Sequence, residues 1–382
     1  MLIKSNKVWL ASQFWPAVIE IKDDKITDIL PSETKADIDY GDKRILPGFI
    51  DIHTHGAYDF DTNDASADGL RYWTAHLGEE GVTSFLPTTI TQSEEVLCKA
   101  LENVAKVMDE GYEGAEILGI HLEGPYLSKE HKGSQPEQYI VKTDIRQFER
   151  YQKAARGHIV YVTLASENDY DFRLTEYLNS HGVTASLGHS SATYEEALMS
   201  YVHGAKSITH VYNGMSPFHH RESGLVGSAF RFKNMYGEII ADLKHSTAAA
   251  LNMFAEAKGP DYLIMVSDSL KVKGLPVGTK RLFGGQEITV NENGLALLND
   301  GTIAGSTLKC NIGLKNMIEE ALIPVDTAIN SLTLNPARCL GADDRKGSIQ
   351  VNKDADLVVL DDDYSVIETY AKGKPQLKNN ND

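Results

Sequence analysis

The middle of the chain repeats one pattern, in which a short apolar run is followed by an amphipathic stretch with helical spacing. This alternation is typical of βα units that build a parallel sheet. Eight such runs fall within about 220 residues, which matches the size of a (β/α)8 barrel; a doubly wound open sheet is the alternative. The predicted strands are ILPGFIDIHTH, VTSFLPTT, EILGIHLEG, IVYVTLASE, VTASLGHS, SITHVYNG, EIIADLKHS and YLIMVSDS.

Both ends of the chain have a different pattern, in which short strand-like runs such as KVWLA and KITDIL are broken by polar turns. We therefore expect an α/β protein in which residues 49–339 form the barrel. Residues 1–48 and 340–382 are expected to form one small β-domain that is built from both termini.

Composition and charge narrow the class of protein. The 382 residues are 42% hydrophobic, so a large core is possible. The formal net charge of -17 makes nucleic acid an unsuitable partner, because phosphate backbones are bound through clustered Lys and Arg. A single phosphate on a small molecule is compatible with that charge, since one local cation or a few backbone N–H groups can hold it.

The chain has the features of a soluble cytoplasmic protein. Its N-terminal residues alternate apolar and polar positions and lack the apolar run of a signal peptide. No later stretch approaches the roughly 20 apolar residues of a membrane helix. Cys98, Cys310 and Cys339 have no CxxC spacing, which argues against a disulfide framework and against a thiolate zinc site. We expect a reducing cytosol and no membrane partner.

Histidine or carboxylate side chains stand where most of the predicted strands end. In a closed parallel barrel these ends meet at one rim, where catalytic groups are found. So many polar groups on one rim would cost much desolvation energy unless a divalent metal compensated them. An imidazole and carboxylate set without thiolate suits Zn, Fe(II), Mn, Co or Ni. The strand-end residues are His53, His55, Glu123, His189, His210, His245 and Asp268.

Six segments resemble the motif series of the N-acetylglucosamine-6-phosphate deacetylases, which belong to the amidohydrolase superfamily. The resemblance runs from about residue 45 to the end of the chain. It implies a (β/α)8 barrel inserted into a small β-sandwich from both termini, a homodimer, and metal-dependent deacetylation in amino-sugar catabolism and cell-wall recycling. The segments are PGFIDIHTHG, HLEGP, LGHS, THVYNGMSPFHHRE, IADLKH and VSDS.

The resemblance implies a centre with one or two metal ions per subunit. One ion would be held by Glu123, His189 and His210. A second would share Glu123 and bind His53 and His55, which face the same side of a strand because they stand two positions apart. The fourth strand, IVYVTLASE, offers no lysine that could be carboxylated to bridge two ions, so Glu123 is the expected bridge.

Asp268 is expected to act both as a ligand of the second ion and as the catalytic acid–base. It would take a proton from the attacking water and pass that proton to the departing amine. The metal would supply a more acidic water and polarise the amide carbonyl. A structural role for Asp268, as a ligand or a strand-end cap alone, is the alternative.

The resemblance also assigns residues that contact an amino-sugar phosphate. Arg221 lies in the loop SPFHHRESG and is expected to reach the phosphate in the neighbouring subunit's site. The segment GSTL is expected to close over the ligand through its backbone groups. The full set of expected substrate contacts is Ser134, Gln135, Asn213, Gly214, Arg221, His245, Ala304, Gly305, Ser306 and Thr307.

Two positions depart from the family pattern. Gln135 stands where several relatives have a histidine; its amide can donate to a developing oxyanion but cannot supply a positive charge. Gly214 stands where many glucosamine-type enzymes have alanine, and N-acetylgalactosamine-6-phosphate deacetylases can have glycine. The galacto epimer is therefore the alternative substrate, and a non-catalytic barrel that binds sugar phosphate is a remote third possibility.

Overall fold

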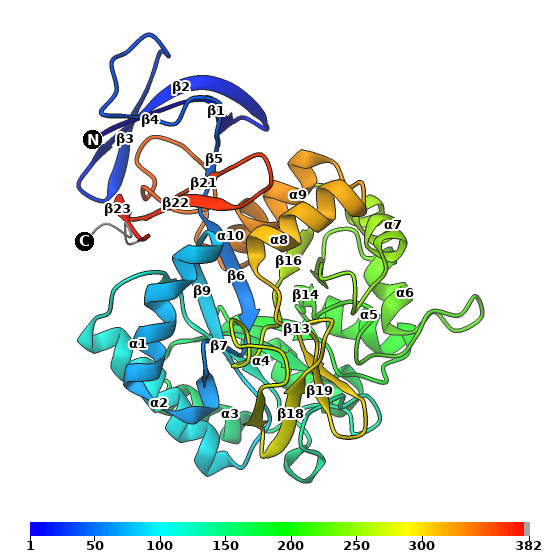
Figure 1. Cartoon of the computed structure of the whole chain (residues 1–382). Coiled ribbons are helices and arrows are strands. Elements are labelled where there is room, and N and C mark those ends of the chain that lie inside the picture. Colours follow the sequence, from blue (N-terminus) through cyan, green and yellow to red (C-terminus); the bar gives the residue numbers. More distant parts are fainter. Residues whose placement is uncertain (378–382) are drawn as a thin grey trace.

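The computed structural model describes residues 1–377 and contains a barrel of parallel strands with a smaller sheet beside it (Figure 1). The barrel strands are β6 (Phe49–Thr54), β9 (Val82–Thr89), β10 (Glu116–Ile117), β11 (Ile120–Glu123), β12 (Ile159–Leu164), β13 (Thr184–Leu187), β14 (Ser207–Ile208), β15 (Tyr236–Ile240) and β16 (Leu263–Val266). β6 pairs with β9, β10 and β11 both pair with β9, and from β11 to β16 each strand pairs with the next one along the chain. This sequential order confirms the predicted barrel, because a doubly wound sheet would reverse direction at a switch point.

Amphipathic helices cover the outside of the barrel. In α2, the Ser93 side chain accepts a hydrogen bond from the Val96 N–H, and Leu97, Leu101 and Val104 face the core at helical spacing. The helices are α1 (Ala67–His76), α2 (Glu94–Glu110), α3 (Ile145–Ala154), α4 (Arg173–Ser180), α5 (Tyr194–Val202), α6 (Gly224–Arg231), α7 (Ala248–Lys258), α8 (Cys310–Lys315), α9 (Val325–Leu332) and α10 (Leu334–Cys339). None within residues 1–377 is long and apolar enough to cross a membrane.

The barrel closes at its rim rather than along a strand ladder. Within residues 1–377, no ladder joins β16 to β6. Instead, the buried Asp51 carboxylate accepts hydrogen bonds from the Ser267 N–H at 3.2 Å and from the Ser267 hydroxyl at 2.5 Å. At the carboxyl end of β6, the Asp268 N–H donates to the His53 carbonyl and the His55 N–H donates to the Ser269 carbonyl, both at 2.9 Å. These contacts bring the first and last barrel strands together.

Strands from both termini form one mixed sheet, at the upper left of Figure 1. Its strands are β1 (Leu2–Leu10), β2 (Gln13–Lys22), β3 (Lys25–Leu30), β4 (Ile38–Asp39), β5 (Arg44–Pro47), β21 (Leu357–Leu360), β22 (Val366–Ala371) and β23 (Lys374–Pro375). β21 pairs antiparallel with β5, so the two ends of the chain meet inside the sheet. The boundaries of the predicted small domain at residues 48 and 340 stay a prediction, and residues 378–382 lie outside the described residues.

A second, antiparallel sheet follows the last barrel strand and lies over the carboxyl end of the barrel, in the lower part of Figure 1. Its strands are β17 (Lys280–Phe283), β18 (Gln286–Val290), β19 (Ala296–Leu298) and β20 (Ile303–Gly305). A separate cluster of buried side chains, including Phe283, Ile288 and Leu270, holds it to the barrel. We did not predict this sheet, and it forms one wall of the cavity described below.

Candidate metal centre and active site

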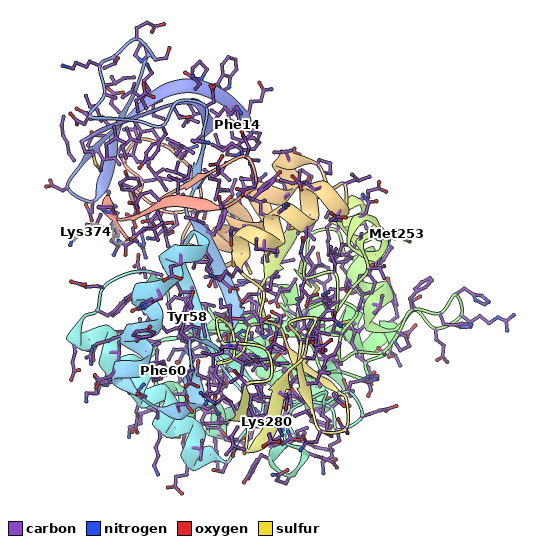
Figure 2. All side chains as sticks on the ribbon, in the orientation of Figure 1. Phe14, Tyr58, Phe60, Met253, Lys280 and Lys374 are labelled. Carbon is purple, nitrogen blue, oxygen red and sulfur yellow. The ribbon has the colours of Figure 1, made fainter. Side chains whose placement is uncertain are left out.

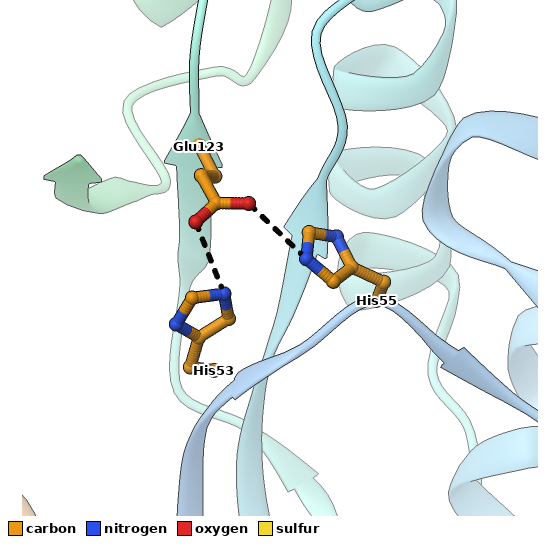
Figure 3. Close-up of side chains that lie close together, drawn as sticks. All are labelled: His53, His55 and Glu123. Carbon is orange, nitrogen blue, oxygen red and sulfur yellow. Dashed lines mark ion pairs between the residues drawn. The ribbon is translucent and has the colours of Figure 1, made fainter. Parts of the chain in front are cut away.

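His53, His55 and Glu123 converge at the carboxyl ends of β6 and β11. The His53 Nε2 lies 3.3 Å from one Glu123 oxygen, and the His55 Nε2 lies 3.2 Å from the other (Figure 3). All three side chains are buried. The alternation of side chains along an extended strand places both imidazoles on the same side of β6, so each can contact one carboxylate oxygen.

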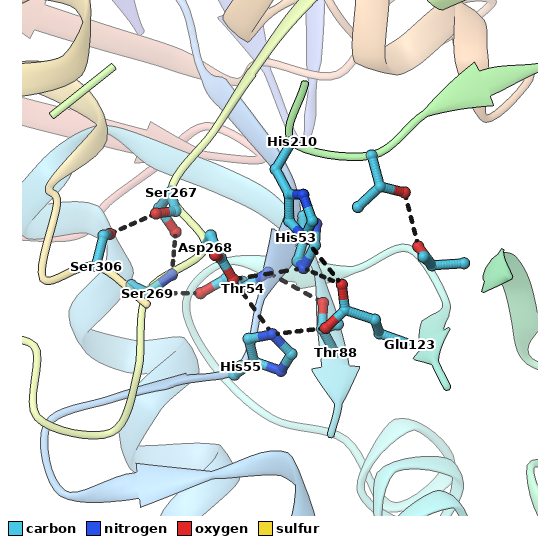
Figure 4. Close-up of polar contacts among 12 residues, drawn as sticks. His53, Thr54, His55, Thr88, Glu123, His210, Ser267, Asp268, Ser269 and Ser306 are labelled. Atoms are coloured by element: carbon cyan, nitrogen blue, oxygen red, sulfur yellow. Dashed lines mark hydrogen bonds and ion pairs between the residues drawn. The ribbon is translucent and has the colours of Figure 1, made fainter. Parts of the chain in front are cut away.

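His189 and His210 approach the same carboxylate from the ends of β13 and β14. The Nε2 atom of each lies 3.4 Å from the Glu123 Oε1, and the two Nε2 atoms are 3.1 Å apart. Asp268 completes the group, with its Oδ1 at 3.2 Å from the His55 Nε2 and 3.5 Å from the His53 Nε2 (Figure 4). The structure therefore brings all six predicted ligands together around Glu123.

Three of these residues have a left-handed backbone conformation that side chains other than glycine rarely adopt. The φ angle is 45° at His189, 26° at His210 and 46° at Asp268. Each residue stands just after a barrel strand, where the chain leaves the sheet. Such conformations cost about 1–3 kcal/mol each and persist only where surrounding contacts hold them, as at functional sites.

Charges at the rim shift the pKa values of its members. Burial alone would lower the pKa of His55, but hydrogen bonds to Asp268 and Glu123 outweigh burial and raise it to about 9. Burial alone would raise the pKa of Glu123, whereas the adjacent His53 and His189 rings hold it well below its usual range. The pKa of Asp268 is also lowered, by His55 and His53 against the effect of burial. Both carboxylates are thus ionised at neutral pH and attract cations.

The residues present fit a divalent metal. His53 Nε2 and Glu123 Oε1 are buried and have no hydrogen-bond partner among the described residues, although buried polar atoms are ordinarily paired. The Nδ1 atom of His53 contacts the Glu238 carboxylate and that of His189 contacts the His131 carbonyl, which leaves both Nε2 atoms facing Glu123. Two groups within residues 1–377 could each hold an ion: His53, His55 and Glu123, and Glu123, His189 and His210. Imidazole nitrogens and carboxylate oxygens without thiolate are typical ligands of Zn and of neighbouring transition metals.

A cavity of about 270 Å³ adjoins this centre. Phe283 and Ile303, from the unpredicted antiparallel sheet, form part of its lining. Glu123 and Asp268 also face it, so a ligand in the cavity would contact the metal centre directly. Seven of the predicted substrate contacts line the cavity: Ser134, Gln135, Asn213, Gly214, His245, Ala304 and Gly305.

Ser306 and Thr307 are not among the residues that line the cavity. Ser306 is buried, and its N–H donates to the Asp268 carbonyl at 2.9 Å. The Thr307 hydroxyl donates to the Gly294 carbonyl. Ser306 thus supports the backbone of Asp268, while Thr307 contacts the turn between β18 and β19. The contact of both residues with substrate stays a prediction.

Arg221 lies outside the cavity of its own chain. It is exposed on the segment between β14 and α6, which projects from the body of the molecule at the right of Figure 1, with side chains pointing into solvent at its tip (Figure 2). A separate groove of about 500 Å³ lies between the base of this segment and the start of α5, and Arg221 lines it with Thr193 and His219.

Several residues that contact the proposed site or line its cavity were not predicted from the sequence. Glu238 is buried in β15 and contacts His53; a single acidic residue within the apolar run EIIA was the available signal. Asp242 accepts from the His245 Nδ1 at 2.7 Å. Phe283 comes from a sheet whose position over the rim depends on contacts distant in sequence.

The amidohydrolase family profile matches residues 44–377. The chain belongs to the amidohydrolase family. It is 44% identical over 337 residues to the N-acetylglucosamine-6-phosphate deacetylase of Bacillus subtilis (strain 168), covering 87% of this chain and 84% of that protein. It is also 32% identical over 330 residues to the N-acetylgalactosamine-6-phosphate deacetylase of Escherichia coli O157:H7, covering 86% and 87% of the two chains.

Solved structures of similar proteins superpose closely on this chain. A mutant N-acetyl-D-glucosamine-6-phosphate deacetylase from Mycobacterium smegmatis, in complex with N-acetyl-D-glucosamine-6-phosphate, superposes with a TM-score of 0.93 at 27% identity over 99% of each chain. The N-acetylglucosamine-6-phosphate deacetylase of Thermotoga maritima gives a TM-score of 0.88 at 29% identity, covering 99% of this chain and 100% of that one.

Proposed function

We propose that this protein hydrolyses N-acetylglucosamine 6-phosphate to glucosamine 6-phosphate and acetate, in amino-sugar catabolism and cell-wall recycling. The observation that carries the proposal is the convergence of four histidines and two carboxylates beside a cavity of about 270 Å³. The 44% identity to a deacetylase of that substrate supports the same reaction.

We propose a centre that holds one or two divalent ions of Zn, Fe(II), Mn, Co or Ni. Glu123, His189 and His210 would hold one ion, and His53 and His55 would hold a second through the shared Glu123. When bound, the metal supplies Lewis acidity, which makes a water more acidic and polarises an amide carbonyl. The protein's own contribution is to orient the imidazoles so that their Nε2 atoms face one carboxylate.

Asp268 is the proposed acid–base. Its lowered pKa keeps the carboxylate ionised near neutral pH, so it can accept the proton of the attacking water. The carboxylic acid formed in this way then donates that proton to the amide nitrogen as the C–N bond breaks, and the amine leaves in neutral form. Asp268 lines the cavity, which gives it access to both the water and the nitrogen.

Gln135 and His245 are proposed to position the sugar. The Gln135 Nε2 donates to the Glu123 Oε2 at 2.7 Å, while its Oε1 accepts from the Thr91 N–H at 2.8 Å, so its amide is fixed at the cavity wall. Burial alone would lower the pKa of His245, but Asp242 outweighs burial and raises it. The contact with Asp242 fixes the orientation of the imidazole at the cavity wall, where it can contact the sugar.

We propose a homodimer in which Arg221 binds the phosphate in the partner's cavity. Arg221 lies on a projecting segment and does not line the cavity of its own chain. A second chain is therefore the natural source of this cation. We also propose a cytoplasmic location, since Cys98, Cys310 and Cys339 are all free thiols.

The galacto epimer is the weaker candidate substrate, because Gly214 has a structural explanation that does not involve the sugar. Its φ is 58°, and a Cβ at this position would lie 2.8 Å from the His189 Nδ1. An alanine here would therefore displace a proposed metal ligand, so this chain needs glycine at the position. The relative from Escherichia coli O157:H7, named for the galacto substrate, is 32% identical.

Acetate release from three compounds tests the proposed function. N-acetylglucosamine 6-phosphate, N-acetylgalactosamine 6-phosphate and unphosphorylated N-acetylglucosamine are assayed before chelation, after it, and after metal is restored. We expect fast, metal-restorable release from the first compound. Preference for the second would replace the substrate and keep the chemistry, whereas no metal-dependent release from any of them would refute the proposal.

A further inference from the structure

A carboxylate lies inside the barrel beneath the metal centre. Glu238 is in the middle of β15 and is completely buried. An unpaired carboxylate in such a place would carry a large desolvation cost, so its partners must compensate it. Glu238 is not among the residues that line the substrate cavity, which excludes direct contact with a ligand there.

The partners of Glu238 are two of the proposed metal ligands and one tyrosine. Its Oε2 lies 3.0 Å from the His53 Nδ1 and accepts from the His210 N–H at 3.3 Å. Its Oε1 accepts from the Tyr161 hydroxyl at 2.5 Å. Tyr161 is also fully buried, so water does not compete for this contact.

These contacts define the chemical form of His53. Glu238 accepts from the Tyr161 hydroxyl and from the His210 N–H, so its carboxylate acts as the acceptor here and the His53 Nδ1 as a third donor. The Nε2 atom is then the nitrogen that can bind an ion, at the point where it lies 3.3 Å from Glu123 and 3.5 Å from Asp268. A carboxylate behind a histidine ligand fixes the ring orientation and increases its basicity.

We propose that Glu238 is a positioning residue that sets the tautomer and orientation of His53, and that Tyr161 orients Glu238 for this role. The proposal rests on the metal centre proposed above and names a residue that acts on it without touching substrate. The contact with the His210 N–H additionally steadies a residue with left-handed backbone.

The other three histidines lack such a partner. The His189 Nδ1 contacts only a neutral carbonyl, that of His131. The Nδ1 atoms of His55 and His210 have no hydrogen-bond partner among the described residues. Loss of Glu238 is therefore expected to weaken mainly the ion held by His53 and His55, and to affect the ion held by His189 and His210 less.

Metal titration of Glu238→Met tests the proposal. Methionine has a similar length but offers no carboxylate, so the His53 ring loses its acceptor. Metal-free wild type and variant are titrated with Zn²⁺ by calorimetry, and bound zinc is counted by mass spectrometry. We expect wild type to bind two ions, and the variant to keep one while binding the other about 10- to 100-fold more weakly.

Glu80→Gln is the matched control. Glu80 is another fully buried carboxylate, but it accepts from the Lys273 Nζ at 2.6 Å and from the Cys310 N–H at 2.9 Å rather than from a histidine. The Glu80→Gln substitution should lower the unfolding temperature and leave both zinc affinities unchanged. Equal loss of zinc from both variants would reduce Glu238 to a structural role and overturn the proposal.

The remaining outcomes separate this inference from the proposed function. If Glu238→Met binds two ions with unchanged affinity, the proposed role of Glu238 is wrong, and the proposed function is not affected. Failure of wild type to load the His53 ion would overturn both this inference and the two-ion centre, while the acetate assay would still decide the activity. If the variant does not fold, ¹⁵N-histidine spectra of zinc-loaded wild type decide: zinc on the His53 Nε2 with Nδ1 protonated supports the proposal, and zinc on Nδ1 overturns it.

Discussion

At the scale of single residues, Glu123 lies at the centre of the proposed metal ligands. Its two oxygens divide the histidines, because Oε2 faces His55 while Oε1 faces His53 and the remaining rings. The Gln135 amide also donates to Oε2, at 2.7 Å. Removal of Asp268, the proposed proton acceptor, should affect the reaction rate more than metal binding, since Glu123 and its histidines remain.

Asp268→Asn is predicted to retain its metal and lose turnover. Asparagine keeps an oxygen at the ligand position but cannot accept and return a proton. We expect kcat to fall by about 10²- to 10⁴-fold, with the metal content of the purified protein unchanged. Steady-state acetate release and elemental analysis measure the two quantities, and a variant with the wild-type rate would remove Asp268 from its proposed role.

Metal binding is predicted to release protons. The pKa of His55 is about 9 in the metal-free protein, well above its ordinary value, so the ring is protonated near neutral pH. An ion must displace that proton to bind its nitrogen, so affinity should fall as the pH falls below about 9. Calorimetry in two buffers of different ionisation enthalpy counts the protons; identical heats in both buffers would contradict the prediction.

At the scale of elements, the barrel strands and their polar ends could be predicted because both are local signals. Apolar runs of strand length marked all eight units, and the residues that follow them converge once the strands are parallel. The antiparallel sheet of residues 280–305 was missed because its place over the rim depends on contacts with distant residues such as Ile90 and Leu270. Glu238 was missed because one acidic residue in a strand does not reveal which histidine it will face.

Barrel closure is predicted to depend on Asp51. Asp51→Ala leaves two donors of Ser267 without their acceptor in a buried place. We expect the free energy of unfolding to fall by about 3 kcal/mol, measured by chemical denaturation. Asp51→Asn, which keeps one acceptor oxygen, should lose clearly less; equal losses would mean that these hydrogen bonds do not close the barrel.

At the scale of the whole molecule, an acidic protein must hold an anionic substrate. The formal net charge of -17 repels a phosphate at long range, so binding depends on local cations. Within one chain, Arg221 stands on a segment that projects away from the body (Figure 1). The proposed dimer supplies this cation from the partner.

Mixing two inactive variants is predicted to restore activity. Arg221→Ala lacks the phosphate contact, and Asp268→Asn lacks the acid–base. If Arg221 acts across the dimer, each mixed dimer has one site with both residues intact. Random exchange at equal amounts should then recover about a quarter of wild-type activity on the phosphorylated substrate at low concentration. No recovery, with exchange verified by mass spectrometry, would place Arg221 in its own chain's site or in none.

The rim that closes the barrel also contains the proposed catalytic residues. Asp268 donates its N–H to the carbonyl of His53, and the carbonyl of the neighbouring Ser269 accepts from the His55 N–H. The last and first strands are thus joined by the proposed acid–base and two proposed metal ligands. Loosening of this junction would separate the acid–base from two metal ligands while the other strands stay paired. Catalytic competence should thus be more fragile than the fold, and activity should decline on heating while the circular dichroism of the helices is still native.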